Sequence, residues 1–580
     1  MFHGLGFFLL DLYWLQMGLK RVIYKCLLFL SFNCMHNLSH SQTWQWFSSA
    51  GGDKSDKGTD IDIDNDGNLY VSGYYNTSSS GNVMFSTITA TANFGKEAFV
   101  AKIDNSGNWQ WVTTGIGGWD ERALGICVDK INRFVYTTGT CWYKMNTFGS
   151  CVPSASVFPG SGDNIFIAKT DFNGNCQWII GAGTGSDDHG YDLVTDKAGN
   201  LYVTGFVSPS TAQADFGIYN VPVSMTDSLG WVAKLSPSGN FKWIKTFHGI
   251  DGERDNRIAI DDSANVYLTG GFYGIKAYDT NTLTSNGDFD VFVLKYDSAG
   301  NQKWARSAGG PLGDRGNSIT VDDKQNVYVT GEFRDVVAFG TDTVDNYGGP
   351  GGRDIFVSKI TKNGNWVWAS KAGSSNGSDR GNRIVSNKKD LLYVTGQIKG
   401  SAKFGTINAI CNPMDSVQVF VAAIDTSGVW SWVMQGGGHK EDRGAGIAVD
   451  PECNVFVTGY YQDTACFGAA CDTSLNRKDI FVTRIASECN IAGIGIKEYD
   501  DFGSAVLFPN PSADKFVISL GRSYSNLTVS VYNVIGQELQ NKKLRALNSI
   551  EIDPGNSSGI YFIRLTSPEG LSKTFKAIKE

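Results

Sequence analysis

A three-part pattern constrains this chain more than any other feature, because it recurs seven times at intervals of roughly 60–67 residues. The first part is an apolar segment that ends in a tryptophan: Trp46, Trp111, Trp178, Trp243, Trp304, Trp368 and Trp432. The second part places an aromatic residue three positions before a glycine: Tyr70, Tyr136, Tyr202, Tyr267, Tyr328, Tyr393 and Phe456. The third part begins at a further aromatic residue: Phe99, Phe166, Trp231, Phe292, Phe356, Phe420 and Phe481.

Each repeat predicts four short antiparallel strands. In one copy these strands lie at 318–322, 327–333, 355–360 and 366–370. Asp-rich turns join the first strand to the second and the third to the fourth, and a glycine or asparagine near the end of each turn supplies the positive φ that a tight reversal needs. The longer, irregular segments fall between the second and third strands. A chain of many short strands is therefore expected.

The repeat is out of phase with the start of the chain. A copy of the fourth strand, at 43–48, precedes everything else, and the last repeat lacks a fourth strand of its own. An open array would leave unpaired strand edges at both ends, which favour aggregation. A ring avoids this, because the strand at 43–48 pairs beside 480–485. The sequence thus predicts an all-β fold, a seven-bladed β-propeller closed by its N-terminal strand.

The recurring motifs resemble the SBBP-type β-propeller repeat family of secreted bacterial proteins. The resemblance covers about residues 43–490 and rests on the Tyr-Val-Thr-Gly strand, the Phe-Val-x-Lys strand and the Gly-Asn-x-x-Trp hairpin. It implies a propeller domain over residues 42–490. It implies little about activity, because such folds carry many functions.

The composition agrees with a strand-rich, exported protein. The 580 residues include 69 glycines and 13 prolines, and 12% of the chain is aromatic. This length is too great for one ordinary core unless the chain is a repeat architecture. A net charge of −8 is spread thinly, and no cluster of lysine and arginine predicts nucleic-acid binding.

The first 41 residues predict a signal peptide. A basic stretch at 20–25 precedes a short apolar stretch at 26–32, and small residues allow a cut before Gln42. The apolar stretch is too short for a transmembrane span. A second apolar run precedes Met17, so Met17 is a candidate for the true start.

The repeat stops near Asn490, and residues 491–504 are predicted to be a linker. Residues 505–580 alternate apolar and polar residues, which predicts a small Ig-like antiparallel β-sandwich. This segment resembles the type A C-terminal sorting domain of the type IX secretion system in Bacteroidota. The resemblance rests on Pro509-Asn510-Pro511, on Val534-Ile535-Gly536-Gln537, on Gly559-Ile560-Tyr561-Phe562 and on the basic end at 572–576.

That resemblance implies one partner, the type IX secretion machinery, which would act through residues 505–580. It also implies a protein that is secreted or held on the outer cell surface. An adhesive Ig-like module is the alternative interpretation of this tail.

An acid–base dipeptide, here called the collar dipeptide, precedes every first strand and is the best candidate site. The seven copies are Asp56-Lys57, Glu121-Arg122, Asp188-His189, Glu253-Arg254, Asp314-Arg315, Asp379-Arg380 and Asp442-Arg443. These connections are expected to ring the mouth of the central channel. One interpretation is a charged collar around a ligand; the other is a repeated ion pair that joins neighbouring blades. Repetition in every copy favours the second.

Other motifs carry less chemistry. Asp62-x-Asp64-x-Asp66-Gly67 resembles half of a calcium loop, but its twelfth position is Gly73 rather than a bidentate glutamate, so calcium is not expected. The residue two positions before each repeat tryptophan is either partly buried, or exposed as a platform on which a sugar ring can pack. These residues are Trp44, Trp109, Cys176, Phe241, Gln302, Trp366 and Trp430.

Disulfides are allowed in an exported protein. Cys453 and Cys489 occupy two turns on one face of the last blade and are the best predicted pair. Pairing of Cys141 with Cys151, and of Cys411 with Cys466 or Cys471, is a weaker expectation.

No catalytic, cofactor-binding or metal-binding motif stands out in the sequence. The first hypothesis for function is therefore a propeller that binds an extracellular ligand, either a glycan or a protein, without enzyme activity. The second is an extracellular glycan hydrolase or lyase with its site at the channel mouth. A cluster of carboxylates with His189 at that mouth would favour the second hypothesis.

Overall fold

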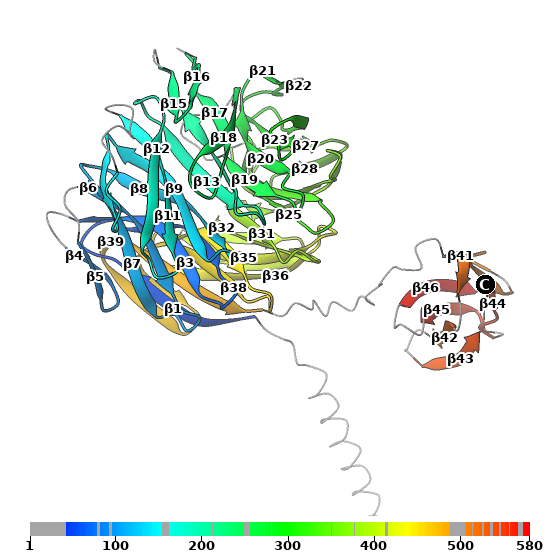
Figure 1. Cartoon of the computed structure of the whole chain (residues 1–580). Helices are drawn as coiled ribbons and strands as arrows, with labels where there is room; N and C mark the ends of the chain where they lie inside the picture. The colour runs from blue at the N-terminus through cyan, green and yellow to red at the C-terminus, as the bar shows by residue number, and fades with distance from the viewer. Residues whose placement is uncertain are drawn as a thin grey trace, which may run out of the picture. The chain divides into compact units, whose positions relative to one another are not determined.

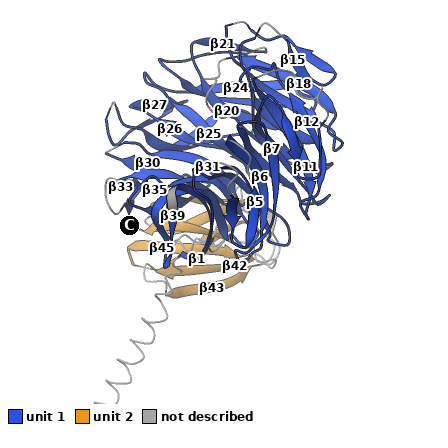
Figure 2. Ribbon diagram, turned by 90° about the vertical axis from the view of Figure 1, so that its left-hand side faces the viewer, with its two compact units in different colours: residues 1–489 blue, residues 490–580 orange. Residues whose placement is uncertain are grey.

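The computed structural model describes residues 42–487 except 78–81, 92–94, 154–161, 211–212, 225, 249–255, 280, 350, 376 and 412–415, and residues 505–579 except 513, 525–526, 534–536, 545–546, 556 and 567–571. Every regular element in these ranges is a β-strand. The chain divides into two compact units, Met1–Cys489 and Asn490–Glu580 (Figure 2). The predicted signal region 1–41 and linker 491–504 lie outside the described residues.

In the first unit the four strands of each repeat pair antiparallel, in order from first to fourth. The first strands are β2 (Lys57–Ile63), β8 (Glu121–Asp129), β13 (His189–Thr195), β19 (Arg257–Ile260), β25 (Arg315–Val321), β31 (Arg380–Ser386) and β37 (Arg443–Val449). The second strands are β3 (Leu69–Thr77), β9 (Phe134–Trp142), β14 (Leu201–Val207), β20 (Val266–Phe272), β26 (Val327–Phe333), β32 (Leu391–Lys399) and β38 (Val455–Phe467).

The third strands are β6 (Gly95–Ile103), β11 (Asp163–Asp171), β17 (Leu229–Leu235), β23 (Asp290–Tyr296), β29 (Asp354–Ile360), β35 (Val417–Asp425) and β39 (Ala470–Ala486). The fourth strands are β7 (Trp109–Gly117), β12 (Cys176–Ala182), β18 (Phe241–His248), β24 (Gln302–Ala308), β30 (Trp366–Ser374), β36 (Trp430–Gly438) and β1 (Thr43–Ala50).

The N-terminal strand completes the sheet of the last repeat. β1 pairs antiparallel with β39, with Thr43 opposite Ala486 and Ala50 opposite Ile480, which confirms the pairing predicted from the phase of the repeat. Figure 1 shows β1, in blue, beside the strands of that repeat. β2 contacts β8 on one side and β37 on the other, and the contacts continue through β13, β19, β25 and β31 to β37. The first strands thus form a closed cycle, and the sheets are arranged like the blades of a propeller.

The invariant glycine of the second strand has a steric cause. A Cβ on Gly331 would lie 1.8 Å from the carbonyl oxygen of Arg315 in the paired first strand, where the register shifts by one residue. Thr330, one residue earlier, donates from Oγ1 to the carbonyl of Phe356 at 2.8 Å. Gly381, on the next first strand, packs against the same hydroxyl, where a Cβ would approach to 2.3 Å. Small residues therefore allow close contact between neighbouring sheets.

The repeat tryptophans join neighbouring sheets. Trp304 Nε1 donates to the carbonyl of Lys362 in the next repeat at 3.1 Å, and its ring lies 6.1 Å from that of Tyr267. At the closure of the ring, Trp46 Nε1 donates to the carbonyl of Asn105 at 3.0 Å, and its ring lies 6.4 Å from that of Phe456. The contact across the closure is therefore the same as the contacts elsewhere.

In five repeats the segment between the second and third strands contains a short hairpin, and in the second repeat β10 (Met145–Phe148) pairs with the fourth strand β7. The hairpin strands are β4 (Asn82–Phe85), β5 (Ile88–Thr91), β15 (Ala214–Phe216), β16 (Tyr219–Val221), β21 (Ile275–Tyr278), β22 (Asn281–Thr284), β27 (Val336–Phe339), β28 (Asp342–Asp345), β33 (Ser401–Phe404) and β34 (Ile407–Ile410). In several repeats a hairpin phenylalanine packs on the residue two before the repeat tryptophan, as Phe85 does on Trp109 at 5.0 Å. Those aromatic residues are buried or half-buried: Trp44, Trp109, Phe241, Trp366 and Trp430. They are not exposed sugar platforms.

Two weaker disulfide expectations are wrong. Cys151 bonds Cys176, and Cys466 bonds Cys471 across the β38–β39 hairpin. Cys141 and Cys411 are buried free thiols. Cys176 occupies the position two before a repeat tryptophan, so this disulfide replaces the aromatic contact made in other repeats. Cys453 is disulfide-bonded, but Cys489 lies outside the described residues, so their pairing stays a prediction.

The second unit consists of two small antiparallel sheets. One is formed by β40 (Val506–Phe508), β41 (Phe516–Tyr524) and β44 (Leu547–Ile552), and the other by β43 (Glu538–Leu544), β42 (Leu527–Asn533), β45 (Gly559–Thr566) and β46 (Ser572–Lys579). Phe516 and Ile550 of the first sheet share one buried core with Val531 and Ile563 of the second. The alternation predicted for this tail thus gives each sheet one buried face.

Candidate functional site at the channel mouth

The acids of the collar dipeptides bind the backbone. Asp314 is representative: its Oδ2 accepts the N–H of Gly310 at 2.8 Å, and its Oδ1 accepts the N–H of Arg334 at 2.9 Å. The carboxylate thereby joins the connection before the first strand to the end of the second strand. The acids with this arrangement are Asp56, Asp188, Asp314, Asp379 and Asp442.

These acids and Glu121 are all 0% exposed. Burial raises the pKa of Asp56 and Asp314 to about 8, against the backbone hydrogen bonds that lower it. Burial also raises the pKa of Glu121 to about 9. The sequence predicts that both members of each dipeptide ring the channel mouth; the structure buries the acids and leaves the mouth to the bases. Glu253 and Arg254 lie outside the described residues.

Four of the bases pair with carboxylates other than those of their own dipeptides. Arg380 Nε lies 2.5 Å from Glu332 Oε2, and Glu332 belongs to the preceding repeat. The other pairs are Arg122 with Asp120 at 3.0 Å, Arg443 with Glu441 at 2.5 Å, and His189 with Asp187 at 3.1 Å and Asp163 at 3.6 Å. Arg315 lies over the ring of Phe289 at 4.5 Å. Two of these pairs, Arg380–Glu332 and His189–Asp163, join neighbouring sheets.

A cavity of about 410 Å³ opens between the first strands at the collar end of the channel. We call it the channel-mouth cavity. Its charged lining residues are Lys57, Arg257, Arg380, Arg443 and Glu332. Tyr74 and Tyr460 line the same cavity, each directly after the invariant glycine of its second strand. In the other repeats this position holds Thr140, Phe206, Gly271, Glu332 and Gln397, so the two tyrosines distinguish one side of the mouth.

The two tyrosines hold a group of cations. Lys57 Nζ lies 4.6 Å from the ring centre of Tyr460 and 5.9 Å from that of Tyr74. Lys96 and Arg122 each lie 5.9 Å from the Tyr74 ring, and Lys478 and Arg443 lie 4.5 and 6.0 Å from the Tyr460 ring. We call Lys57, Lys96, Arg122, Arg443, Lys478, Tyr74 and Tyr460 the cation–tyrosine cluster. It spans the last, first and second repeats.

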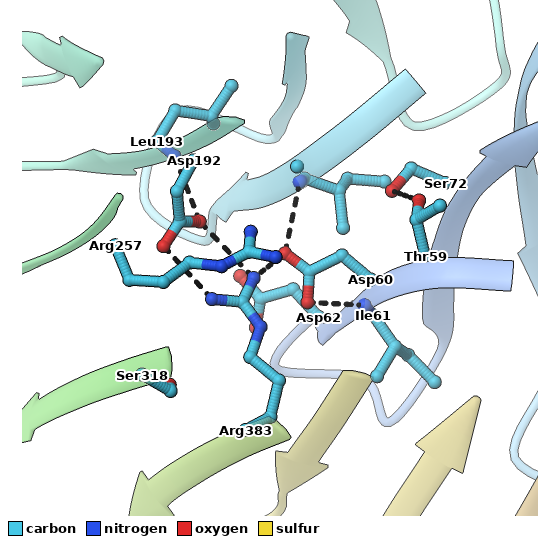
Figure 3. Close-up of polar contacts among 12 residues, drawn as sticks. Thr59, Asp60, Ile61, Asp62, Ser72, Asp192, Leu193, Arg257, Ser318 and Arg383 are labelled. Atoms are coloured by element: carbon cyan, nitrogen blue, oxygen red, sulfur yellow. Dashed lines mark hydrogen bonds and ion pairs between the residues drawn. The ribbon is translucent and has the colours of Figure 1, made fainter. Parts of the chain in front are cut away.

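Four charged residues of the first strands form the channel ion cluster: Asp60, Asp192, Arg257 and Arg383 (Figure 3). Arg257 lines the channel-mouth cavity, and the other three line a second cavity. Arg383 bonds Asp60 through Nη2 and lies 2.9 Å from Asp192 Oδ2 through Nη1. All four occupy one position of the first strand, four after the acid of the collar dipeptide. The other repeats have Gly125, Ser318 and Gly446 there.

The channel ion cluster keeps one carboxylate ionised. Burial alone would raise the pKa of Asp192, but the guanidinium groups of Arg383 and Arg257 hold it below its usual value. The second cavity, of about 490 Å³ and lined by Asp60, Asp62, Arg383 and Lys197, lies at the opposite end of these strands. The cluster therefore separates two cavities. The sequence analysis missed both the channel ion cluster and the two tyrosines. The sign that could have revealed them is that these positions differ from repeat to repeat while the residues around them recur.

His189, Asp163 and Asp187 form a group of metal-ligand type. One ligand atom from each lies within 4.8 Å of the others, and their burial ranges from half-buried to exposed. The two carboxylates raise the pKa of His189 to about 8 although burial opposes them. The calcium-like turn behaves differently: Asp64 accepts hydrogen bonds from Asn68 Nδ2 at 2.9 Å and from Tyr70 Oη at 3.1 Å, which closes the hairpin.

Two family models match the chain. Residues 506–580 match the secretion system C-terminal sorting domain, and residues 303–332 match the beta-propeller repeat. The chain thus contains a β-propeller repeat and a secretion sorting domain. The sorting domain confirms the type IX resemblance of the tail and, with it, a secreted or outer-surface location.

Similar proteins leave the ligand of this β-propeller repeat protein open. It is 21% identical over 423 residues to an uncharacterized WD repeat-containing protein of Acanthamoeba polyphaga mimivirus, covering 60% of this chain and 30% of that protein. Among solved structures, the polysaccharide lyase Uly1 is 8% identical with a TM-score of 0.40, covering 77% of this chain and 99% of its own. A glycoside hydrolase family 32 protein from Bifidobacterium adolescentis is 9% identical with a TM-score of 0.23, covering 92% and 96%. Among the described residues, no helix has the length and hydropathy to cross a membrane.

Proposed function

We propose that this protein is a seven-bladed β-propeller that is exported by its Ig-like sorting domain and binds an extracellular ligand in the channel-mouth cavity. The blade count is supported by the seven sequence repeats, by the closed cycle of first strands and by β1, which completes the sheet of the last repeat. The two sheets of the tail, which share one core, support the Ig-like assignment.

The observation that carries the binding role is the loss of repeat symmetry at the channel-mouth cavity. Contacts between sheets use nearly the same residues in every repeat, whereas the cavity is lined at positions that change from one repeat to the next. A volume of about 410 Å³ lies in the range of small-molecule and sugar sites. Concave sites with a few convergent polar groups are the usual ligand sites of folds that otherwise repeat.

A cavity-filling variant tests this proposal. Ala445 is half-buried and lines the channel-mouth cavity, so Ala445→Trp places an indole in it without changing charge. Thr195→Trp is the matched control, because Thr195 lines the opposite cavity. On an array of neutral and acidic polysaccharides we expect the protein to bind at least one class. Ala445→Trp should lose that binding and Thr195→Trp should keep it. Binding to no glycan, or equal binding by Ala445→Trp, would contradict the proposal.

A second candidate function, an extracellular glycan hydrolase or lyase, is favoured by one observation. His189 contacts Asp163 of the preceding repeat and Asp187 of its own, so one basic group and two carboxylates meet at one collar dipeptide. An imidazole between carboxylates is suited to proton transfer near neutral pH. Shortening of a bound polysaccharide that is lost in His189→Gln would make the protein an enzyme and not only a binding module.

A further inference from the structure

Positive charge is concentrated at the channel mouth of a protein whose net charge is −8. Four of the five charged residues that line the channel-mouth cavity are cations, and Glu332, the one acid among them, is already paired with Arg380. Behind this lining lie Lys96, Arg122 and Lys478 of the cation–tyrosine cluster. Two acids, Asp120 and Glu441, form ion pairs with the cluster, and each contacts two of its cations. These pairs use four of the five cations and leave Lys57 outside them.

Lys57 is the centre of this positive region. In the described part of the chain no carboxylate lies within ion-pair distance of its ammonium group, which rests between the rings of Tyr460 and Tyr74. Burial and then the repulsion of Arg443 lower the pKa of Lys57. An uncompensated ammonium group that its neighbours repel is stabilised when an anion enters, because the anion supplies the missing opposite charge.

An aromatic surface lies next to these cations. Trp119 is 67% exposed and directly precedes Asp120, whose carboxylate holds Lys96 at 2.5 Å and Arg122 at 3.0 Å. Large exposed aromatic side chains beside polar groups are typical of binding surfaces. The apolar face of a sugar ring can pack on such an indole while its charged substituent reaches the cations.

We propose that the channel-mouth cavity binds an acidic polysaccharide, with a sugar carboxylate or sulfate between Lys57 and Arg443 and a neighbouring ring on Trp119. This inference rests on the proposed binding function and specifies its ligand. Lys57 and Arg443 both contact the ring of Tyr460, so one anionic group can reach both. Asn317 and Asn382, which line the same cavity, offer amide groups for hydroxyls.

A polysaccharide fits this site better than a nucleic acid does. Cations lie over the rings of Tyr460 and Tyr74, so these rings are not available to stack successive bases. The cations form one compact group at a cavity rather than a stripe along a groove, which suits separate charged substituents on sugars better than a continuous phosphate backbone.

Titration calorimetry on the full-length exported protein tests the ligand class. The probes are polygalacturonate, which carries carboxylates, dextran sulfate, amylose as a neutral glycan and single-stranded DNA. We expect binding of polygalacturonate or dextran sulfate, and the one that binds identifies the anionic group. Lys57→Met and Arg443→Gln should each weaken that binding at least about tenfold, since each removes a charge-assisted hydrogen bond to the anionic group. Lys197→Met, which removes the same charge from the opposite cavity, should not change it.

The other outcomes show whether the acidic ligand, the binding function or both are wrong. Amylose binding that is lost in Ala445→Trp and unchanged in Lys57→Met would overturn the acidic ligand and keep the binding function. DNA bound as tightly as the acidic glycans would overturn the choice of polysaccharide. No binding of any probe would overturn both. Because Lys57 packs between two rings, thermal unfolding of Lys57→Met is measured alongside; Arg443→Gln, at a side chain 36% exposed, tests the proposal if Lys57→Met unfolds.

Discussion

The contacts between neighbouring sheets and the residues along the channel follow opposite rules. Between sheets, a threonine hydroxyl, a glycine and a tryptophan make nearly the same contacts from one repeat to the next. Along the channel, the position four after each collar acid holds aspartate, glycine, arginine or serine. Repeated residues therefore hold the fold together, whereas the residues that vary give the channel a charge pattern with no rotational symmetry.

The collar dipeptides show both rules in adjacent residues. The acid has the same role in five of the repeats, because each of these aspartates accepts backbone N–H groups from the same two segments. The base has a different partner in each repeat, from Asp120 to Glu332 to Glu441. A repeated motif can thus contain one structural position and one position that is free to specialise.

The largest effect is expected where the repeated contacts close the ring. Deleting residues 42–50 removes β1, so β39 loses one of its two partner strands and Phe456 loses its contact with Trp46. We expect a fall in Tm of more than about 10 °C or loss of cooperative unfolding, because a whole edge of buried hydrogen bonds and apolar contacts is exposed. Circular dichroism during heating measures this.

A peptide of residues 42–50 is the control for the deletion. If β1 acts by filling the last sheet, the added peptide should restore part of the lost Tm. As a comparison within the ring, Trp46→Ala should cost about as much as Trp178→Ala, because both indoles donate to a carbonyl of the next repeat. A deletion that unfolds at the original temperature would mean that the ring is not closed by β1.

The next largest effect is expected in the channel ion cluster. Arg383→Met leaves Asp60 and Asp192 buried without their shared cation, which should cost about 3–5 kcal/mol of unfolding free energy. Adding Asp60→Asn and Asp192→Asn to the same chain should recover most of this loss. Lys303→Met, at a half-exposed ion pair, is the control and should stay within about 0.5 kcal/mol. Urea unfolding gives these values; a small loss in Arg383→Met would show that water enters the channel and compensates the charges.

The repeated part of this molecule could be predicted from the sequence because each copy adds evidence for the same strand. The seven aromatic–glycine pairs gave the second strand, and the surplus strand at 43–48 gave its partner at 480–485. The channel could not be predicted in this way. Arg383 meets Asp192 and Asp60 across 191 and 323 residues of chain, and one copy of a residue carries no periodic signal.

The role of each residue within a repeated motif could not be predicted from the sequence either. The collar acids resembled members of ion pairs, but their partners are backbone N–H groups, which every residue except proline has and which therefore leave no sequence signal. Likewise Cys151 was expected to pair within its own insertion. It pairs with Cys176 instead, because the insertion folds onto the fourth strand where other repeats place an aromatic residue.

The smallest effect, a pH dependence, separates the two kinds of carboxylate most sharply. Asp314 has its pKa raised to about 8 by burial, whereas arginines hold the pKa of Asp192 below its usual value. Between pH 5 and 8 folded Asp314 holds a proton that the unfolded chain, with a pKa of about 3.9, has lost, so rising pH removes stability. The loss of unfolding free energy caused by Asp314→Asn should therefore shrink from pH 5 to 8.

The loss caused by Asp192→Asn should stay constant over that range. It should shrink only below about pH 4, where the ionised form that the arginines stabilise is lost. Urea midpoints at pH 3, 5 and 8 measure both; if the cost of Asp314→Asn instead grew with pH, the backbone N–H groups would outweigh burial and the repeated acids would be ionised like those of the channel.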